Sequence, residues 1–267
     1  MSHAVRAGRQ CRGREHDDLR RTAAQTSTAG TLVDLVTAPA DPARVAAALA
    51  DAARLGGYAT VVPDVAGAPV SRVYADGPEL GRRSAQVRAA LHCDERVAAS
   101  LTQQGFAASL VTPLIAAAVV HGVLPLLGPD ELHWRETASG PWRQSCAEPR
   151  GRLVTGADDA VAALAGALLD PHLHPLVAAV RARASVSPTV LWGNAASAVA
   201  AAGRLVAAEW PQHAGRAAAV VRGLLATGPF AGTGEFRGRA YRRRSCCLFH
   251  RAPGGGLCGD CVLQPRA

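Results

Sequence analysis

Residues 243–261 read RRSCCLFHRAPGGGLCGDC and contain four of the seven cysteines of this 267-residue chain. The four are Cys246, Cys247, Cys258 and Cys261, spaced C-C-x10-C-x2-C. Four thiols gathered near one chain end predict a single metal centre. Two centres need four thiolates at such short spacing: a tetrahedral structural zinc site or a 2Fe-2S cluster with two cysteines on each iron.

The spacing of the thiols favours iron over zinc. A zinc ribbon is normally built from two C-x2-C turns, and here only Cys258 and Cys261 have that spacing. Cys246 and Cys247 are adjacent, and neighbouring side chains of an extended segment point to opposite faces. This pair therefore needs a turn between its members or a wide centre approached from two directions. A two-iron cluster is the wider centre, and zinc remains the alternative.

The residues around the cysteines suit a buried anionic cluster. Pro253 and the glycines at 254–256 predict a turn whose backbone N–H groups can point at sulfur. With four thiolates, an oxidised 2Fe-2S centre carries about two negative charges, which are costly to bury alone. We expect nearby cations to raise its reduction potential, with Arg243, Arg244 and Gly256 next to the cluster. The arginines close in sequence are Arg237, Arg239, Arg242, Arg243, Arg244 and Arg251. The alternative is a solvated basic face.

These residues resemble the FhuF-type ferric siderophore reductases, whose C-terminal signature has the same C-C-x10-C-x2-C spacing and binds a 2Fe-2S cluster. All four cysteines match that spacing. The segments LWGNAASAVAAAGRLV (191–206) and SLTQQGFAASLVTPLIAAAVVHGVLP (100–125) also look like the body of such proteins. The resemblance thus extends over residues 30 to 263.

The resemblance implies an oxidoreductase that passes one electron from its cluster to iron held in a ferric siderophore of hydroxamate type, releasing Fe(II) in the cytoplasm. Hard oxygen ligands hold Fe(III) far more tightly than Fe(II), so reduction loosens the complex. The implied ligands are the four cysteines, with no further catalytic residue. The resemblance also implies a flavin- or ferredoxin-type electron donor. Because the chain lacks a dinucleotide fingerprint, we expect no direct NAD(P)H use. We also expect transient membrane proximity and no nucleic-acid partner.

Candidate substrate contacts are Trp134, Arg135, Trp192 and Asn194, which combine flat apolar surface with polar groups. The alternative is that the aromatic residues belong to the core. His172 and His174, in DPHLHP, read as surface residues at the start of a helix rather than metal ligands. His250 lies inside the cysteine loop and, with four cysteines present, is expected at most to contact the ligands.

Composition leaves two rival functions open. The formal charge is +8 without a single lysine, and aromatic residues make up only 4%. A DNA-binding iron-sulfur sensor would use this charge, although Arg181-Ala182-Arg183 is the one promising arginine stretch. A non-catalytic domain with zinc in the cysteine site is the second rival. Cys11, Cys93 and Cys146 lie singly, so no disulfide framework is indicated and a reducing cytoplasm is expected.

The remaining sequence predicts an α+β fold that is predominantly helical, with a small antiparallel sheet and a cysteine-rich C-terminal tail. We expect a disordered Arg-rich extension over 1–30, a helical scaffold for siderophore binding over 31–235 and a cluster-binding segment over 236–267. Residues 228–244 read as a linker. The predicted strands are 132–137, 142–146 and 151–155. The predicted helices are 41–56, 84–105, 113–123, 157–169, 171–184, 188–208 and 213–226.

The stretch from Val97 to Pro129 has no formally charged residue and is long enough to span a bilayer. Polar residues and two prolines interrupt it, and its apolar residues are largely alanine, which contributes little to membrane insertion. We therefore expect a buried helix pair broken at Thr112-Pro113.

Overall fold

The computed structural model describes residues 38–65, 67–75, 78–138 and 140–265. Residues 37–267 form one compact unit. The predicted extension over 1–30, with Cys11, lies outside the described residues.

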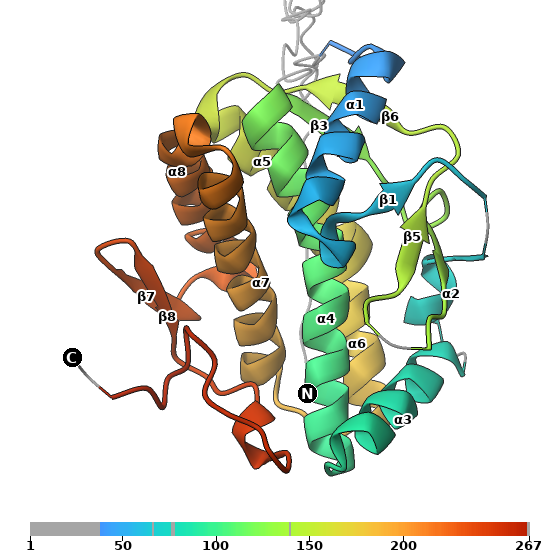
Figure 1. The fold of residues 1–267 in the computed structure, drawn as a ribbon, viewed down its shortest axis with the longest axis vertical. Helices are drawn as coiled ribbons and strands as arrows, with labels where there is room; N and C mark the ends of the chain where they lie inside the picture. Colours follow the sequence, from blue (N-terminus) through green and yellow to red (C-terminus); the bar gives the residue numbers. More distant parts are fainter. Residues whose placement is uncertain (1–37, 66, 76–77, 139, 266–267) are drawn as a thin grey trace, which may run out of the picture. The chain divides into compact units, whose positions relative to one another are not determined.

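Helices dominate the fold, as the sequence predicted (Figure 1). The α-helices are α1 (Pro42–Ala52), α2 (Ser71–Tyr74), α3 (Glu79–Leu91), α4 (Glu95–Ala116), α5 (Gly156–Leu168), α6 (His174–Arg183), α7 (Pro188–Glu209) and α8 (Ala214–Leu225). π-helical turns at Ala117–His121 and Leu169–Leu173 follow α4 and α5, and short 3-10 turns occupy Ala53–Leu55, Gly57–Ala59, Pro211–His213, Gly228–Phe230 and Phe249–Arg251.

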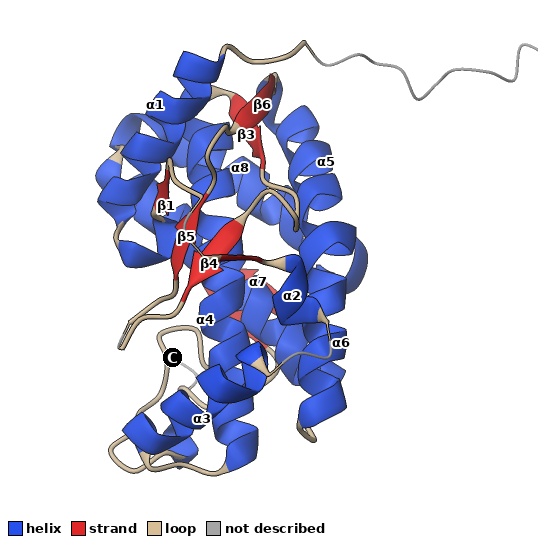
Figure 2. Ribbon diagram, turned by 90° about the vertical axis from the view of Figure 1, so that its right-hand side faces the viewer, coloured by secondary structure: helices blue, strands red, loops and turns tan. Residues whose placement is uncertain are grey.

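Three small sheets complete the fold, and Figure 2 shows the largest lying against the helices. The strands are β1 (Val61–Val62), β2 (Ala68–Pro69), β3 (Val123–Leu126), β4 (His133–Arg135), β5 (Arg143–Ser145), β6 (Arg150–Leu153), β7 (Gly234–Arg237) and β8 (Ala240–Arg243). The order β1-β5-β4-β2 forms one sheet, in which β1 and β5 are parallel and the other pairs antiparallel. The antiparallel pairs β3–β6 and β7–β8 form the others.

The helices α4 and α7 lie side by side at the centre of the fold (Figure 1). Each spans 22 residues and begins at a capped end, where Asp94 accepts the backbone N–H of Val97 and Ser187 that of Thr189. Both helices are rich in alanine and are buried over most of their length. This pair forms the platform for the cysteine segment.

The expected helix break at Thr112-Pro113 is wrong, because α4 runs through Pro113. Proline inside a helix leaves the carbonyl four residues earlier without its usual donor. The hydroxyl of Thr112 bonds back to the carbonyl of Ala108 at 2.8 Å, and Pro113 itself is buried. Tertiary packing around this turn therefore outweighs the local penalty. The break lies earlier, where His92 adopts a left-handed conformation and separates α3 from α4 within the predicted 84–105 helix.

Two predictions about strands also need correction. The strand near 151–155 exists as β6, but it pairs with β3 and not with the β4–β5 hairpin. Residues 123–126, whose start was assigned to a helix, form β3.

The predicted linker over 228–244 contains the β7–β8 hairpin, in which Tyr241 and Arg243 are buried. The segment boundary expected at 236 consequently falls inside β7.

Three helical stretches are long and apolar enough, by length and composition, to cross a membrane: Glu95–His121, Gly156–Arg183 and Pro188–Glu209. Of their most apolar windows, 72%, 44% and 72% are buried inside the protein. Packing against other elements thus accounts for much of the apolar composition of α4 and α7.

His172 is buried, which corrects the prediction of a surface residue. Its Nε2–H donates to the carbonyl of Leu127 at 2.7 Å, so Nδ1 accepts from the Tyr74 hydroxyl, also at 2.7 Å. Burial lowers the pKa of His172 from its ordinary value of 6.5. The neutral ring therefore joins the π-helical turn before α6 to the segment after β3.

The free energy of unfolding should fall as the pH drops below 6.5, because the unfolded chain then binds a proton that the buried ring of His172 does not. His172→Gln removes this titration, so the loss of unfolding free energy between pH 7.5 and 5.5 should shrink by about 1 kcal/mol. Urea unfolding of the unaltered protein and of His172→Gln at both pH values measures this loss. An unaltered loss in the variant would contradict the assignment.

Candidate metal centre

The β7–β8 hairpin delivers the first cysteine pair. Strand β8 ends at Arg243, three residues before Cys246. After the pair, Leu248 takes a left-handed conformation at φ 73°, and its N–H donates to Cys246 Sγ at 3.3 Å. The 3-10 turn Phe249–Arg251 continues the chain. The backbone therefore turns immediately after Cys247, and the adjacent cysteines belong to one folded loop.

The second cysteine pair occupies a tight turn with the same kind of support. The N–H of Cys261 donates to the carbonyl of Cys258 at 3.0 Å, and the side chain of Gln264 donates to that carbonyl at 3.1 Å. The N–H of Leu263 donates to Cys261 Sγ at 3.4 Å. In both pairs, one sulfur accepts from the backbone N–H two residues later, which is the support that metal-bound thiolates require.

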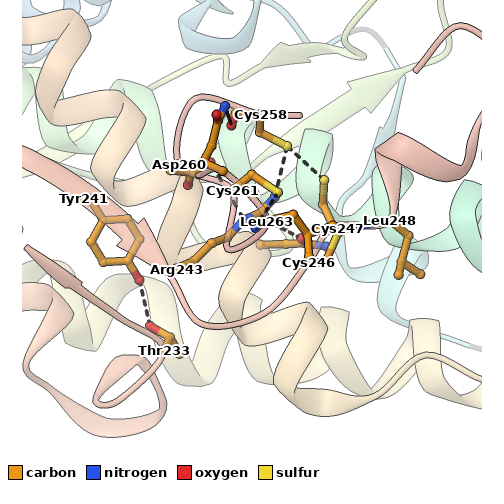
Figure 3. A network of polar contacts seen from close by, with 12 residues as sticks. Thr233, Tyr241, Arg243, Cys246, Cys247, Leu248, Cys258, Asp260, Cys261 and Leu263 are labelled. Atoms are coloured by element: carbon orange, nitrogen blue, oxygen red, sulfur yellow. Dashed lines mark hydrogen bonds and ion pairs between the residues drawn. The ribbon is translucent and has the colours of Figure 1, made fainter. Parts of the chain in front are cut away.

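The two pairs meet at the sulfurs of Cys247 and Cys258, which are 3.1 Å apart (Figure 3). A disulfide would bring them to about 2.05 Å, and all six cysteines among the described residues are free. Across these residues, no three His, Cys, Asp or Glu side chains converge as a single-ion site requires. Two pairs of thiols that meet at one point suit a 2Fe-2S cluster, in which each iron takes two thiolates.

Arg243 is buried against the cysteines, with 1% of its surface exposed. Its guanidinium donates to Cys258 Sγ at 3.2 Å and to the side-chain oxygen of Asn194 at 2.9 Å. The Asp260 carboxylate lies 3.8 Å away. Burial alone would lower the pKa of Arg243, but Asp260 and the cysteines Cys247 and Cys258 outweigh it and raise that pKa. The site thus contains a permanent buried cation.

The platform helices hold the cysteine loop through three small or polar residues. Asn194 on α7 donates to the carbonyl and the hydroxyl oxygen of Ser100 on α4, each at 3.0 Å. Ser100 in turn donates to the carbonyl of Cys247 at 2.9 Å. Gly193 allows Ser245 to approach α7, because a Cβ there would lie 2.0 Å from the Ser245 hydroxyl oxygen.

The donors that reach the sulfurs come from the backbone and from one side chain. The N–H groups of Leu248 and Leu263 donate to Cys246 and Cys261, and the Arg243 guanidinium donates to Cys258. Metal-bound thiolates require such donors. Four cysteines supported in this way fit a 2Fe-2S cluster.

The pKa values of Cys246 and Cys258, one cysteine from each pair, are raised in the absence of metal. Burial raises the pKa of Cys246. Burial and the neighbouring Cys247 raise the pKa of Cys258 to about 12. Metal binding to these side chains must therefore displace protons, as it does at thiolate sites in general.

The structure does not bring the four predicted substrate residues together. Trp134 lies on β4, is 4% exposed and stacks on Trp142, while its neighbour Arg135 is exposed. Trp192 is partly buried against Phe230. Burial argues against substrate contact for Trp134 and for Asn194, which binds Arg243 instead.

The other residues predicted near the cluster differ in their surroundings. Arg244 is exposed and pairs with Glu235 at 3.8 Å. Gly256 is exposed, whereas a Cβ at Gly255 would lie 2.1 Å from the carbonyl oxygen of Phe249. His250 is exposed, and its Nδ1 lies 3.3 Å from Cys246 Sγ.

Sequence reasoning missed Ser100, Gly193, Ser245 and Asp260. A glycine-asparagine pair inside the otherwise apolar start of α7 was the available signal, since polar residues on a buried helix face need a specific partner.

Gly193→Ala should displace Ser245 and the cysteine pair that follows it, lowering the iron bound per chain and the free energy of unfolding by about 1–3 kcal/mol. Iron and sulfide analysis with thermal unfolding measures both. Gly166→Ala is the matched control, because this exposed position on α5 has no atom within 4 Å of the added Cβ. The control should retain full iron content, and equal loss in both variants would contradict the role of Gly193.

Two family models match this chain, one over the helical body and one over the cysteine segment. The model described as the ferric iron reductase FhuF-like transporter matches residues 103–245, more than half of the chain. The model described as the FhuF 2Fe-2S C-terminal domain matches residues 243–263. No individual protein of curated function matches the chain.

Proposed function

Because this chain belongs to the FhuF-like ferric iron reductase family and carries its 2Fe-2S C-terminal domain, we propose that it reduces the iron of a ferric siderophore in the cytoplasm. In this proposal the cluster ligands are Cys246, Cys247, Cys258 and Cys261. The meeting of the two cysteine pairs at 3.1 Å, on the platform of α4 and α7, is the observation that carries it.

When bound, the 2Fe-2S cluster supplies one-electron chemistry between a flavin- or ferredoxin-type donor and siderophore-bound Fe(III), which becomes Fe(II). Hydroxamate oxygens bind Fe(III) far more strongly than Fe(II), so one electron is sufficient to loosen the complex. The chain's own task is therefore to hold and orient the cluster, and no side chain needs to transfer a proton.

The cysteines differ in exposure in a way that suits electron exchange at the surface. Cys247 and Cys261 are buried, whereas Cys246 and Cys258 are partly exposed. Leu257 and Leu263, next to the second pair, are 43% and 49% exposed. These residues leave one side of the site open to a donor or to a chelate, while the platform helices exclude water from the other.

A cytoplasmic location is part of the proposal and is supported by the chemistry of the thiols. Cys93 and Cys146 are free, as are the four proposed ligands. Free thiols and thiolate-bound clusters persist where glutathione and thioredoxin keep cysteine reduced.

The deciding experiment mixes the anaerobically purified, reduced protein with a ferric hydroxamate siderophore and traps Fe(II) with a chromogenic chelator. We expect the bleached cluster to regain its visible absorption as the ferrous chelate appears, one Fe(II) for each cluster. Cys247→Ser should lose the cluster and the reaction. Cys93→Ser, which alters a thiol outside the cysteine loop, should retain both.

Two outcomes would contradict the proposal. A cluster that stays reduced beside ferric hydroxamates would favour the iron-sulfur sensor over the reductase. A colourless protein with one zinc ion would remove the electron-transfer function altogether.

A further inference from the structure

We infer that Arg243 is a positioning residue that sets the reduction potential of the cluster, through one positive charge fixed between Cys258 and Asn194. This role goes beyond the proposed function. The reduction potential is a property of the 2Fe-2S cluster and does not depend on which substrate the cluster reduces. Three features give Arg243 this role: its charge is buried, its position is fixed, and it lies closer to the sulfur of Cys258 than to the Asp260 carboxylate.

Burial makes the charge of Arg243 effective. Its side chain is completely buried and its Nη2 lies 3.2 Å from Cys258 Sγ. Charges in contact inside a protein interact far more strongly than in water, and salt screens them little. Arg244 next to it shows the contrast, since its side chain is 62% exposed. Of the two neighbours, Arg243 alone acts on the cysteines through protein rather than through water.

The position of the guanidinium is fixed from both helices of the platform. The Asn194 amide donates both its hydrogen bonds to Ser100, so its oxygen must face Arg243. The Ser100 hydroxyl contacts the carbonyl of Cys247. The sulfurs of Cys247 and Cys258 also meet (Figure 3), so these contacts form a closed ring. Each member of the ring limits the movement of the next.

Asp260 also faces this cation, but its carboxylate stands farther from the guanidinium than the sulfur of Cys258 does. Its carboxylate lies 3.8 Å from Arg243 Nε, beyond hydrogen-bonding distance, whereas the contacts to Cys258 and Asn194 are hydrogen bonds. Arg243 Nε consequently has no hydrogen-bond partner in the described protein. The geometry directs the cation toward the sulfur more closely than toward the carboxylate.

A fixed cation stabilises the reduced cluster more than the oxidised one, because reduction adds a negative charge to a centre that already carries about two. Arg243 therefore raises the reduction potential. Removing its charge should make the cluster harder to reduce, and removing the charge of Arg244 should have little effect.

The test is an anaerobic redox titration of Arg243→Gln, Arg243→Lys and the matched control Arg244→Gln, followed by electron paramagnetic resonance. Iron and sulfide content are measured in parallel. At a fixed solution potential, Arg243→Gln should shift the ratio of reduced to oxidised cluster at least tenfold toward the oxidised form, a change of about 59 mV for a one-electron couple. Arg243→Lys should shift the ratio of reduced to oxidised cluster less than Arg243→Gln does. Arg244→Gln should change this ratio less than about twofold.

The titration needs no siderophore, so its result is independent of whether the reductase function is correct. An Arg243→Gln protein with full cluster content and an unchanged ratio would overturn the inference, as would an equal shift in Arg244→Gln. If Arg243→Gln assembles no cluster but Arg243→Lys does, the Lys variant carries the test: a ratio shifted toward the oxidised cluster supports the inference, and an unchanged ratio overturns it. If neither Arg243→Gln nor Arg243→Lys assembles the cluster, the shape of the arginine side chain is what the site requires, and the inference is overturned.

Discussion

The burial of a negatively charged centre against a helical core is the constraint on which the rest of this structure depends. Four thiolates with two irons cannot be removed from water without compensation, and the chain provides it through the buried guanidinium of Arg243 and the backbone N–H groups of Leu248 and Leu263. Arg243 must itself be held, and Asn194 and Ser100 hold it. The ring of contacts thereby makes the cysteine loop part of the core.

The composition of α4 and α7 follows from the same requirement. Small residues let the two helices and the loop approach closely, and at Gly193 even one methyl group would collide with Ser245. Polar residues are placed where the loop rests on the helices, while apolar residues bury the remaining faces. Helices that could span a membrane by length and composition thus serve as the support of a metal centre.

Local chemistry explains which features could be predicted from the sequence. The cysteine spacing indicated a two-iron centre, and the resemblance it carried led to the family that the comparisons assign. The caps of α4 and α7 obey local rules, although only the cap at Ser187 was recognised. Pro113, His172 and the β7–β8 hairpin were misjudged, because each depends on partners distant in sequence. The Arg- and Gly-rich stretch 228–244 has the composition of a linker. Its packing becomes evident only when Arg243 is seen to bind the buried Asn194.

The sequence by itself determined the ligand types, the two-pair spacing of the cysteines and the helical character of the chain, since these follow from the chemistry of thiols and from local periodicity. Only the tertiary structure decided which of several arginines faces the sulfur, and that the buried Asn194 binds this arginine. The physical reason is that burial is a property of the assembled fold. Adjacent arginines have the same charge and pKa in an unfolded chain, and they differ when packing removes water from one and leaves the other in solvent.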